Sequence, residues 1–154
     1  MGGVSRLRKD LSGYSHIVID TMILIYVLEK HQLYFPLARQ ILKNIESGQN
    51  PCFISAVTLT ELLTAPAQAD DLTAMRDYEM YLLNFPHLTI VPIDVEVATE
   101  AAHLRASTGL PTPDAIILAT AVQTKAKAII TNDKRWRNKL SDIDIILLED
   151  YLVS

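Results

Sequence analysis

One stretch near the start of the chain constrains the fold more than any other, because a strand pattern there runs directly into a helix pattern. Residues 17–19 read Ile-Val-Ile, and residues 21–29 continue as a mainly apolar helix. Asp20 lies at the junction, where its side chain can cap the helix by accepting a hydrogen bond from a free N–H group. Ligands of open parallel sheets bind beside the carboxyl ends of the strands, so Asp20 is also a candidate site residue.

Strand and helix patterns alternate along most of the remaining chain. Further short strands are predicted around residues 52–56, 88–93, 128–131 and 143–148, and helical periodicity fills most of the segments between them. This alternation predicts an α/β fold, namely a three-layer α/β/α sandwich with a mainly parallel sheet of about five strands.

The length of 154 residues fits one domain. Residues 1–15 include several basic side chains but no apolar segment of the kind found in a secretory signal. We therefore expect a flexible N-terminal extension over residues 1–15 and a single folded domain over residues 16–154.

Composition and charge exclude several classes of protein. The net charge is −4, which argues against a broad basic surface for duplex DNA. Cys52 is the single cysteine, so the chain has no internal disulfide and no cysteine-rich zinc site, and a reducing compartment such as the cytoplasm is expected. No apolar run approaches the length of about 20 residues that a membrane-spanning helix needs, so no association with a membrane is expected.

Three further acids occupy positions comparable to that of Asp20. Asp133 closely follows the predicted strand 128–131. Asp114 falls in the first turn of an apolar helix that leads into the amino end of that strand, so the helix must begin near the opposite edge of the sheet. Glu61 stands three residues after Thr58, a spacing typical of a capping box, but it also lies near the end of a predicted strand. All four acids are therefore predicted to lie along one edge.

Converging carboxylates repel one another unless they are protonated, separated by water or bound to a cation. A hard divalent ion such as Mg²⁺ or Mn²⁺ prefers oxygen ligands of this kind. A zinc site is not supported, because the chain has no two histidines four residues apart and only one cysteine. Metal sites made of oxygen ligands usually serve phosphate chemistry, so the pattern predicts hydrolysis of a phosphodiester bond.

Four successive motifs resemble those of a known family. The stretches IVIDTMILIY, TLTELL, PDAIILATA and IITND look like the motifs of the PIN-domain ribonucleases, and the likeness covers nearly the whole chain from His16. The resemblance implies a compact α/β nuclease that binds Mg²⁺ or Mn²⁺ through acids matching Asp20, Glu61, Asp114 and Asp133. By the same resemblance, Thr131 matches a hydroxyl near the site and Thr21 follows the first acid.

The resemblance also implies a biological role. Small single-domain members of this family are mostly VapC-type toxins of toxin–antitoxin systems. It therefore implies an endoribonuclease that acts on RNA in the cytoplasm, forms a homodimer and is blocked by a cognate antitoxin protein.

A basic run follows the last of these acids and consists of Lys134, Arg135, Trp136 and Arg137. Its charges could pair with phosphates and its ring could stack on a base, as binding of single-stranded RNA requires. The alternative is a solvated loop that is anchored by one tryptophan. Arg105, near the end of a predicted helix, is likewise either an RNA contact or a favourable charge at the helix C-terminus.

Two alternatives remain open. A receiver-like domain also has acids at strand ends, and Asp94 would be its phosphate acceptor, although Asp20 stands alone where such a domain has paired acids. The second alternative is a catalytically inert PIN-like module with a binding or regulatory role. Met22 is a departure from the family pattern, since the family often has Ser or Asn at that position.

Overall fold

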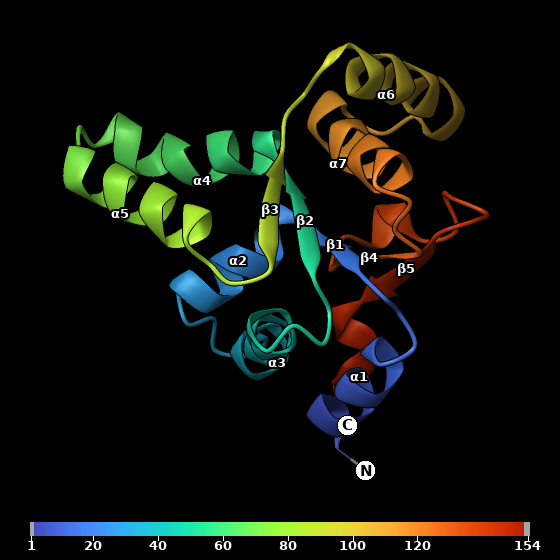
Figure 1. The fold of residues 1–154 in the computed structure, drawn as a ribbon, viewed down its shortest axis with the longest axis horizontal. Helices are drawn as coiled ribbons and strands as arrows, with labels where there is room; N and C mark the ends of the chain where they lie inside the picture. Colours follow the sequence, from blue (N-terminus) through green and yellow to red (C-terminus); the bar gives the residue numbers. More distant parts are fainter. Residues whose placement is uncertain (1, 153–154) are drawn as a thin grey trace.

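The structure is a computed structural model, and it describes residues 2–152. Within that range, five strands form one sheet in the spatial order β3-β2-β1-β4-β5 (Figure 1). Each neighbouring pair of strands is parallel, which confirms the predicted sheet. The strands are β1 (Ile17–Ile19), β2 (Cys52–Ser55), β3 (Leu88–Val91), β4 (Ala128–Thr131) and β5 (Asp144–Leu147).

Helices connect the strands and cover both faces of the sheet, as the predicted three-layer sandwich requires (Figure 1). Helices α4 and α5 pack against each other and extend outward beside β3, on the left of Figure 1. Two short 3₁₀ helices, η1 and η2, follow β4 and β5. The helices are α1 (Gly3–Leu11), α2 (Thr21–Leu28), α3 (Phe35–Glu46), α4 (Ala56–Gln68), α5 (Leu72–Leu83), α6 (Val95–Thr108), α7 (Thr112–Gln123), η1 (Lys134–Trp136) and η2 (Leu148–Tyr151).

The central strands are apolar along their whole length because both of their faces are covered. Ile17 and Ile19 of β1 pack into the core beneath α1, α2 and α3. Val18, between them, points to the other side and packs with residues of α6 and α7. Successive side chains of a strand alternate between the two faces, so a strand buried on both sides reads as a continuous apolar run.

The N-terminal segment differs from the expectation of a flexible extension over residues 1–15. Residues 3–11 form helix α1, in which Leu7 and Leu11 lie four residues apart and are fully buried. The Tyr151 hydroxyl donates a hydrogen bond to Asp10, and the Arg6 guanidinium lies 5.1 Å from the centre of the Tyr151 ring. Helix α1 is therefore part of the folded domain, because Leu7 and Leu11 pack into the same apolar core as α3 and η2.

Two helix boundaries agree with the sequence patterns. Asp94 caps α6 by accepting a hydrogen bond from the backbone N–H of Val97 at 2.9 Å. Gly109 ends that helix in the left-handed conformation, with φ of 74°, which glycine adopts without a steric cost. Among the helices of the described residues, none is long and apolar enough to cross a membrane.

Candidate active site

Asp20 lies at the carboxyl end of β1 and is only 7% exposed. One of its oxygens, Oδ1, accepts a hydrogen bond from the backbone N–H of Thr21 at 2.7 Å, so Asp20 caps α2 as expected. Its other oxygen, Oδ2, accepts a hydrogen bond from the Thr131 hydroxyl at 2.8 Å. Thr131 ends the neighbouring strand β4, so the two strands together fix the orientation of this carboxylate.

Burial raises the pKa of Asp20 to about 6. The hydrogen bonds from Thr131 and Thr21 oppose this rise, whereas the negative charges of Glu61 and Asp114 add to it. Glu61 comes from α4 and Asp114 from the first turn of α7. A cation placed among these groups would lower the pKa of Asp20 and relieve the repulsion.

Glu61 is connected to Asp20 through the next residue in the chain. The Thr21 hydroxyl donates a hydrogen bond to Glu61 Oε1 at 2.6 Å, and it lies 2.9 Å from the Thr58 hydroxyl. The capping-box interpretation of Thr58 and Glu61 is wrong, because α4 already begins at Ala56 and Ser55 is its N-cap. Thr58 is instead buried inside the helix, where it lies against Thr21.

Asp114 lies in the first turn of α7, as predicted, although the helix begins at Thr112 with Pro111 before it as the N-cap. Its Oδ2 atom accepts hydrogen bonds from the indole N–H of Trp136 at 3.3 Å and from the Arg135 guanidinium at 3.0 Å. Burial raises the pKa of Asp114, and the charge of Asp133 adds to this effect, whereas Trp136 and Arg135 oppose it.

Asp133 is held by a single arginine. Arg135 donates from Nε to both carboxylate oxygens of Asp133, at 3.0 and 3.1 Å, and from Nη2 to Oδ2 at 2.6 Å. The hydrogen bonds from Arg135 lower the pKa of Asp133. Because the same Nη2 atom also contacts Asp114, the guanidinium bridges the acids that follow β4 and begin α7.

The four acids have the right chemistry for a hard divalent ion, since each offers carboxylate oxygens and two of them have raised pKa values. Their present arrangement is not that of a closed metal site. Across residues 2–152, no three Asp, Glu, His or Cys side chains come close enough together to hold a metal ion. A guanidinium, itself a cation, lies between two of the acids.

The basic run does not form the open surface that a stacked base would need. Trp136 is fully buried, so the expectation that its ring stacks on a base needs correction, and the alternative of an anchoring tryptophan describes it better. Lys134 pairs with Glu149 at 3.3 Å, and Arg137 pairs with Asp150 at 3.1 Å. The charges of the run are therefore partly met by acids of the same chain.

Arg105 lies at the C-terminal end of α6, away from the basic run in sequence. Its Nε donates a hydrogen bond to the carbonyl oxygen of Leu110 at 3.2 Å. The contact ties the end of α6 to the turn that leads into α7. Arg105 lies in the last turn of α6, where a positive charge is favourable for the helix dipole.

Some supporting contacts were not predicted from the sequence. The sulfur of Met22 accepts a hydrogen bond from the backbone N–H of Asn132 at 3.2 Å. The side chain of Asn132 in turn donates to the Tyr26 hydroxyl at 3.1 Å and accepts from the backbone N–H of Glu149 at 2.9 Å. Met22 therefore replaces a polar residue of the family pattern with a weak sulfur acceptor at the same junction of β1, α2 and β4.

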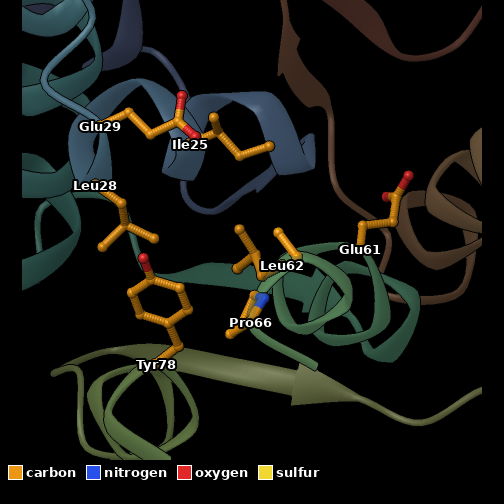
Figure 2. A pocket seen from close by; sticks show the side chains of 8 residues that line it. Ile25, Leu28, Glu29, Glu61, Leu62, Pro66 and Tyr78 are labelled. Atoms are coloured by element: carbon orange, nitrogen blue, oxygen red, sulfur yellow. The ribbon is translucent and has the colours of Figure 1, made fainter. Parts of the chain in front are cut away.

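An apolar pocket of about 110 Å³ lies next to Glu61, between α2, α4 and α5. Figure 2 shows Leu62 and Tyr78 facing into it, whereas the carboxylate of Glu61 points away from these apolar side chains. Glu61 thus stands at the border of the pocket, and its charged group is directed elsewhere.

Comparison with protein families gives one clear match. The family model described as the PIN domain matches residues 17–140, which include all four acids. This match decides against the receiver-like alternative, and the side chain of its proposed acceptor, Asp94, instead caps α6. No protein among the curated sequences matches the chain significantly.

Solved structures with a similar fold include components of toxin–antitoxin complexes. A complex from Klebsiella pneumoniae has a TM-score of 0.66 and 23% identity, over 89% of this chain and 99% of that chain. FitAcB from Neisseria gonorrhoeae has a TM-score of 0.64 and 21% identity, over 86% of this chain and 98% of that chain. VapBC2 from Rickettsia felis, bound to a DNA fragment from its promoter, has a TM-score of 0.62 and 18% identity, over 84% and 96% of the respective chains.

Proposed function

The chain belongs to the PIN-domain family, and on this premise we propose that it is a Mg²⁺- or Mn²⁺-dependent endoribonuclease. The observation that carries the proposal is the environment of Asp20. This carboxylate is buried at a strand end, hydrogen-bonded by Thr131 and Thr21, and subject to the charges of two further acids. A buried carboxylate near two other negative charges contributes little to the stability of a fold. Binding of a cation is therefore the better explanation for Asp20 at this position.

In this proposal the divalent ion is held by Asp20, Glu61, Asp114 and Asp133. When bound, such an ion lowers the pKa of water and neutralises charge on the phosphoryl oxygens of the substrate.

The chain's own hydroxyl and indole groups orient the acids. The Thr131 hydroxyl donates to Asp20 and also accepts the backbone N–H of Asp133 at 3.1 Å. The Thr21 hydroxyl holds Glu61, and the Trp136 indole holds Asp114. Because Thr21, Thr131 and Trp136 are buried, the core of the protein orients the carboxylates of Asp20, Glu61 and Asp114. The carboxylate of Asp133 is held instead by the exposed side chain of Arg135.

The proposed partners are those that the family resemblance implies. We propose that the substrate is RNA, that the protein works in the cytoplasm as a homodimer, and that a cognate antitoxin protein blocks it. The toxin–antitoxin complexes found among the similar structures support this role. Lys134, Arg135 and Arg137 remain proposed phosphate contacts, since all three side chains are exposed at the same edge as the acids.

A second candidate function is favoured by one observation. Arg135 already satisfies two of the four acids, as would suit a catalytically inert PIN-like module that binds a partner without cleaving RNA. Such a module would bind RNA or protein in the presence of chelator as well as in its absence.

The test is cleavage of single-stranded and structured RNA by the purified protein with Mg²⁺, Mn²⁺ or EDTA. Wild type should cleave RNA with either metal, and EDTA should stop the reaction. Asp20→Asn should abolish cleavage, whereas Asp94→Asn is the matched control, because both acids cap a helix after a strand but Asp94 lies outside the site. Cleavage that persists in EDTA, or that survives Asp20→Asn, contradicts the proposed metal mechanism.

A further inference from the structure

Arg135 makes the contacts with the site acids that a bound cation would make. Its Nη2 atom lies 2.6 Å from Asp133 Oδ2 and 3.0 Å from Asp114 Oδ2. The guanidinium is thus the positive charge around which these carboxylates are arranged.

The other cations of the basic run have different partners. Lys134 and Arg137 pair with Glu149 and Asp150, which lie in η2 after the last strand. The bridge between Asp114 and Asp133 is therefore a specific property of Arg135 rather than a general effect of positive charge nearby.

The Arg135 side chain can dissociate from Asp114 and Asp133 while its backbone stays in place. The backbone N–H of Arg135 donates to Asp133 Oδ1 at 2.9 Å, and this contact keeps the residue beside the acid. The Arg135 side chain is 59% exposed, so water can solvate the guanidinium when it leaves, whereas the side chains of Asp114 and Asp133 are only 19% and 18% exposed and stay in place. The guanidinium can therefore move into solvent without disrupting η1.

A divalent ion and the guanidinium cannot both use these oxygens. Asp133 Oδ2 accepts two hydrogen bonds from Arg135, and Asp114 Oδ2 accepts one from Arg135 and one from Trp136, so neither oxygen has a lone pair left for an ion. An ion bound to these oxygens would also repel the guanidinium beside it. We propose that Arg135 is a built-in competitor of the divalent ion, which must displace the guanidinium from Asp114 and Asp133 in order to bind. This inference rests on the proposed metal-dependent function.

The test is to measure the affinity of the full chain for Mn²⁺ alone, by the loss of the free-ion signal in electron paramagnetic resonance at constant ionic strength. Arg135→Gln should bind Mn²⁺ about threefold to tenfold more tightly than wild type, because the ion pairs of Arg135 with Asp114 and Asp133 no longer oppose binding. Arg137→Gln is the matched control, since it removes the same charge two residues away without touching the site acids. Arg135→Lys keeps the charge but cannot bridge both acids as a planar fork. Its affinity for Mn²⁺ should therefore lie between those of wild type and Arg135→Gln.

A second measurement follows the arginine directly. In ¹⁵N spectra of the wild type, the Nε–H signal of Arg135 should move towards that of a free side chain as Mg²⁺ is added, whereas the signal of Arg137 should stay in place. Equal affinity of Arg135→Gln and wild type for Mn²⁺, or equal tightening in Arg137→Gln, would overturn the competition. If no variant binds Mn²⁺ at all, the metal-dependent function fails, and the inference fails with it.

Discussion

The Thr131 hydroxyl donates a 2.8 Å hydrogen bond to Asp20 Oδ2, although the two residues lie 111 positions apart in the chain. The contact joins the carboxyl ends of β1 and β4, and both of its residues are buried. Removal of the donor would leave a buried carboxylate oxygen, and the backbone N–H of Asp133, without their partner.

We therefore expect Thr131→Val to lower the free energy of unfolding by about 1 to 3 kcal/mol, the usual cost of an unsatisfied buried polar group. Urea unfolding at neutral pH with EDTA measures this change. Thr131→Ser keeps the hydroxyl and is the control, so a valine variant as stable as the serine variant would contradict the role assigned to the hydrogen bond.

The stability of the metal-free protein should depend on pH through Asp20. Its pKa is about 6 in the folded chain, above the ordinary value of 3.8, so the folded state holds the proton more tightly than the unfolded state. Stability is therefore lost as pH rises through this window, by roughly 2 kcal/mol between about pH 4 and pH 7. Burial also raises the pKa of Asp114, so Asp114 contributes a loss in the same direction, whereas the hydrogen bonds from Arg135 lower the pKa of Asp133.

Asp20→Asn removes this titration and keeps a side chain that can still cap α2. The difference in unfolding free energy between the variant and wild type, measured in EDTA, should grow in favour of the variant as pH rises towards neutrality. A difference that stays constant across the window would mean that Asp20 titrates as an ordinary exposed acid.

Helix α1 should contribute to global stability rather than behave as a tail. Leu7 is fully buried in the core, so Leu7→Ala should lower the free energy of unfolding by about 2 to 5 kcal/mol. Arg8 lies next to it on the exposed side of the helix, and Arg8→Ala is the control. Equal denaturation midpoints for the two variants would be expected only if the helix were not docked.

The basic run can be tested through the salt dependence of RNA binding. In the Asp20→Asn background, Lys134→Gln with Arg137→Gln should lower the slope of log affinity against log salt by about 0.7 for each phosphate that the protein no longer neutralises. The control is Lys125→Gln with Lys127→Gln, which removes two exposed charges near the amino end of β4, the opposite edge of the sheet. An unchanged slope in the first variant would assign Lys134 and Arg137 to the ion pairs with Glu149 and Asp150 alone.

The fold could be predicted from the sequence because short stretches of neighbouring residues determine each strand and most helix boundaries. An apolar run such as Ile17–Ile19 followed by a helix pattern indicates a strand buried on both faces, and Gly109 marks a helix end whatever lies around it. Asp20 and Asp133 could be placed in the same way, since the carboxyl ends of parallel strands share one edge.

The remaining features depend on contacts between distant segments. The leucine pair of α1 could be assigned to the core only once the surface that receives it was known, and Tyr151 on that surface comes from the other end of the chain. The ion pair between Arg135 and Asp114 could not be predicted from the sequence. Asp114 lies 21 positions earlier, and the packing of α7 brings it to Arg135. The burial of Trp136 likewise follows from its place against the α7 side of the sheet.

The raised pKa of Asp20 also bears on how a cell would escape the proposed activity. Asp20→Asn removes the buried charge and keeps an oxygen that can accept a hydrogen bond, so it should stop the proposed activity while the polypeptide still folds and accumulates. Escape mutants selected during expression should therefore include soluble, full-length proteins altered at this carboxylate, and protein yield alone would not distinguish them from the active form.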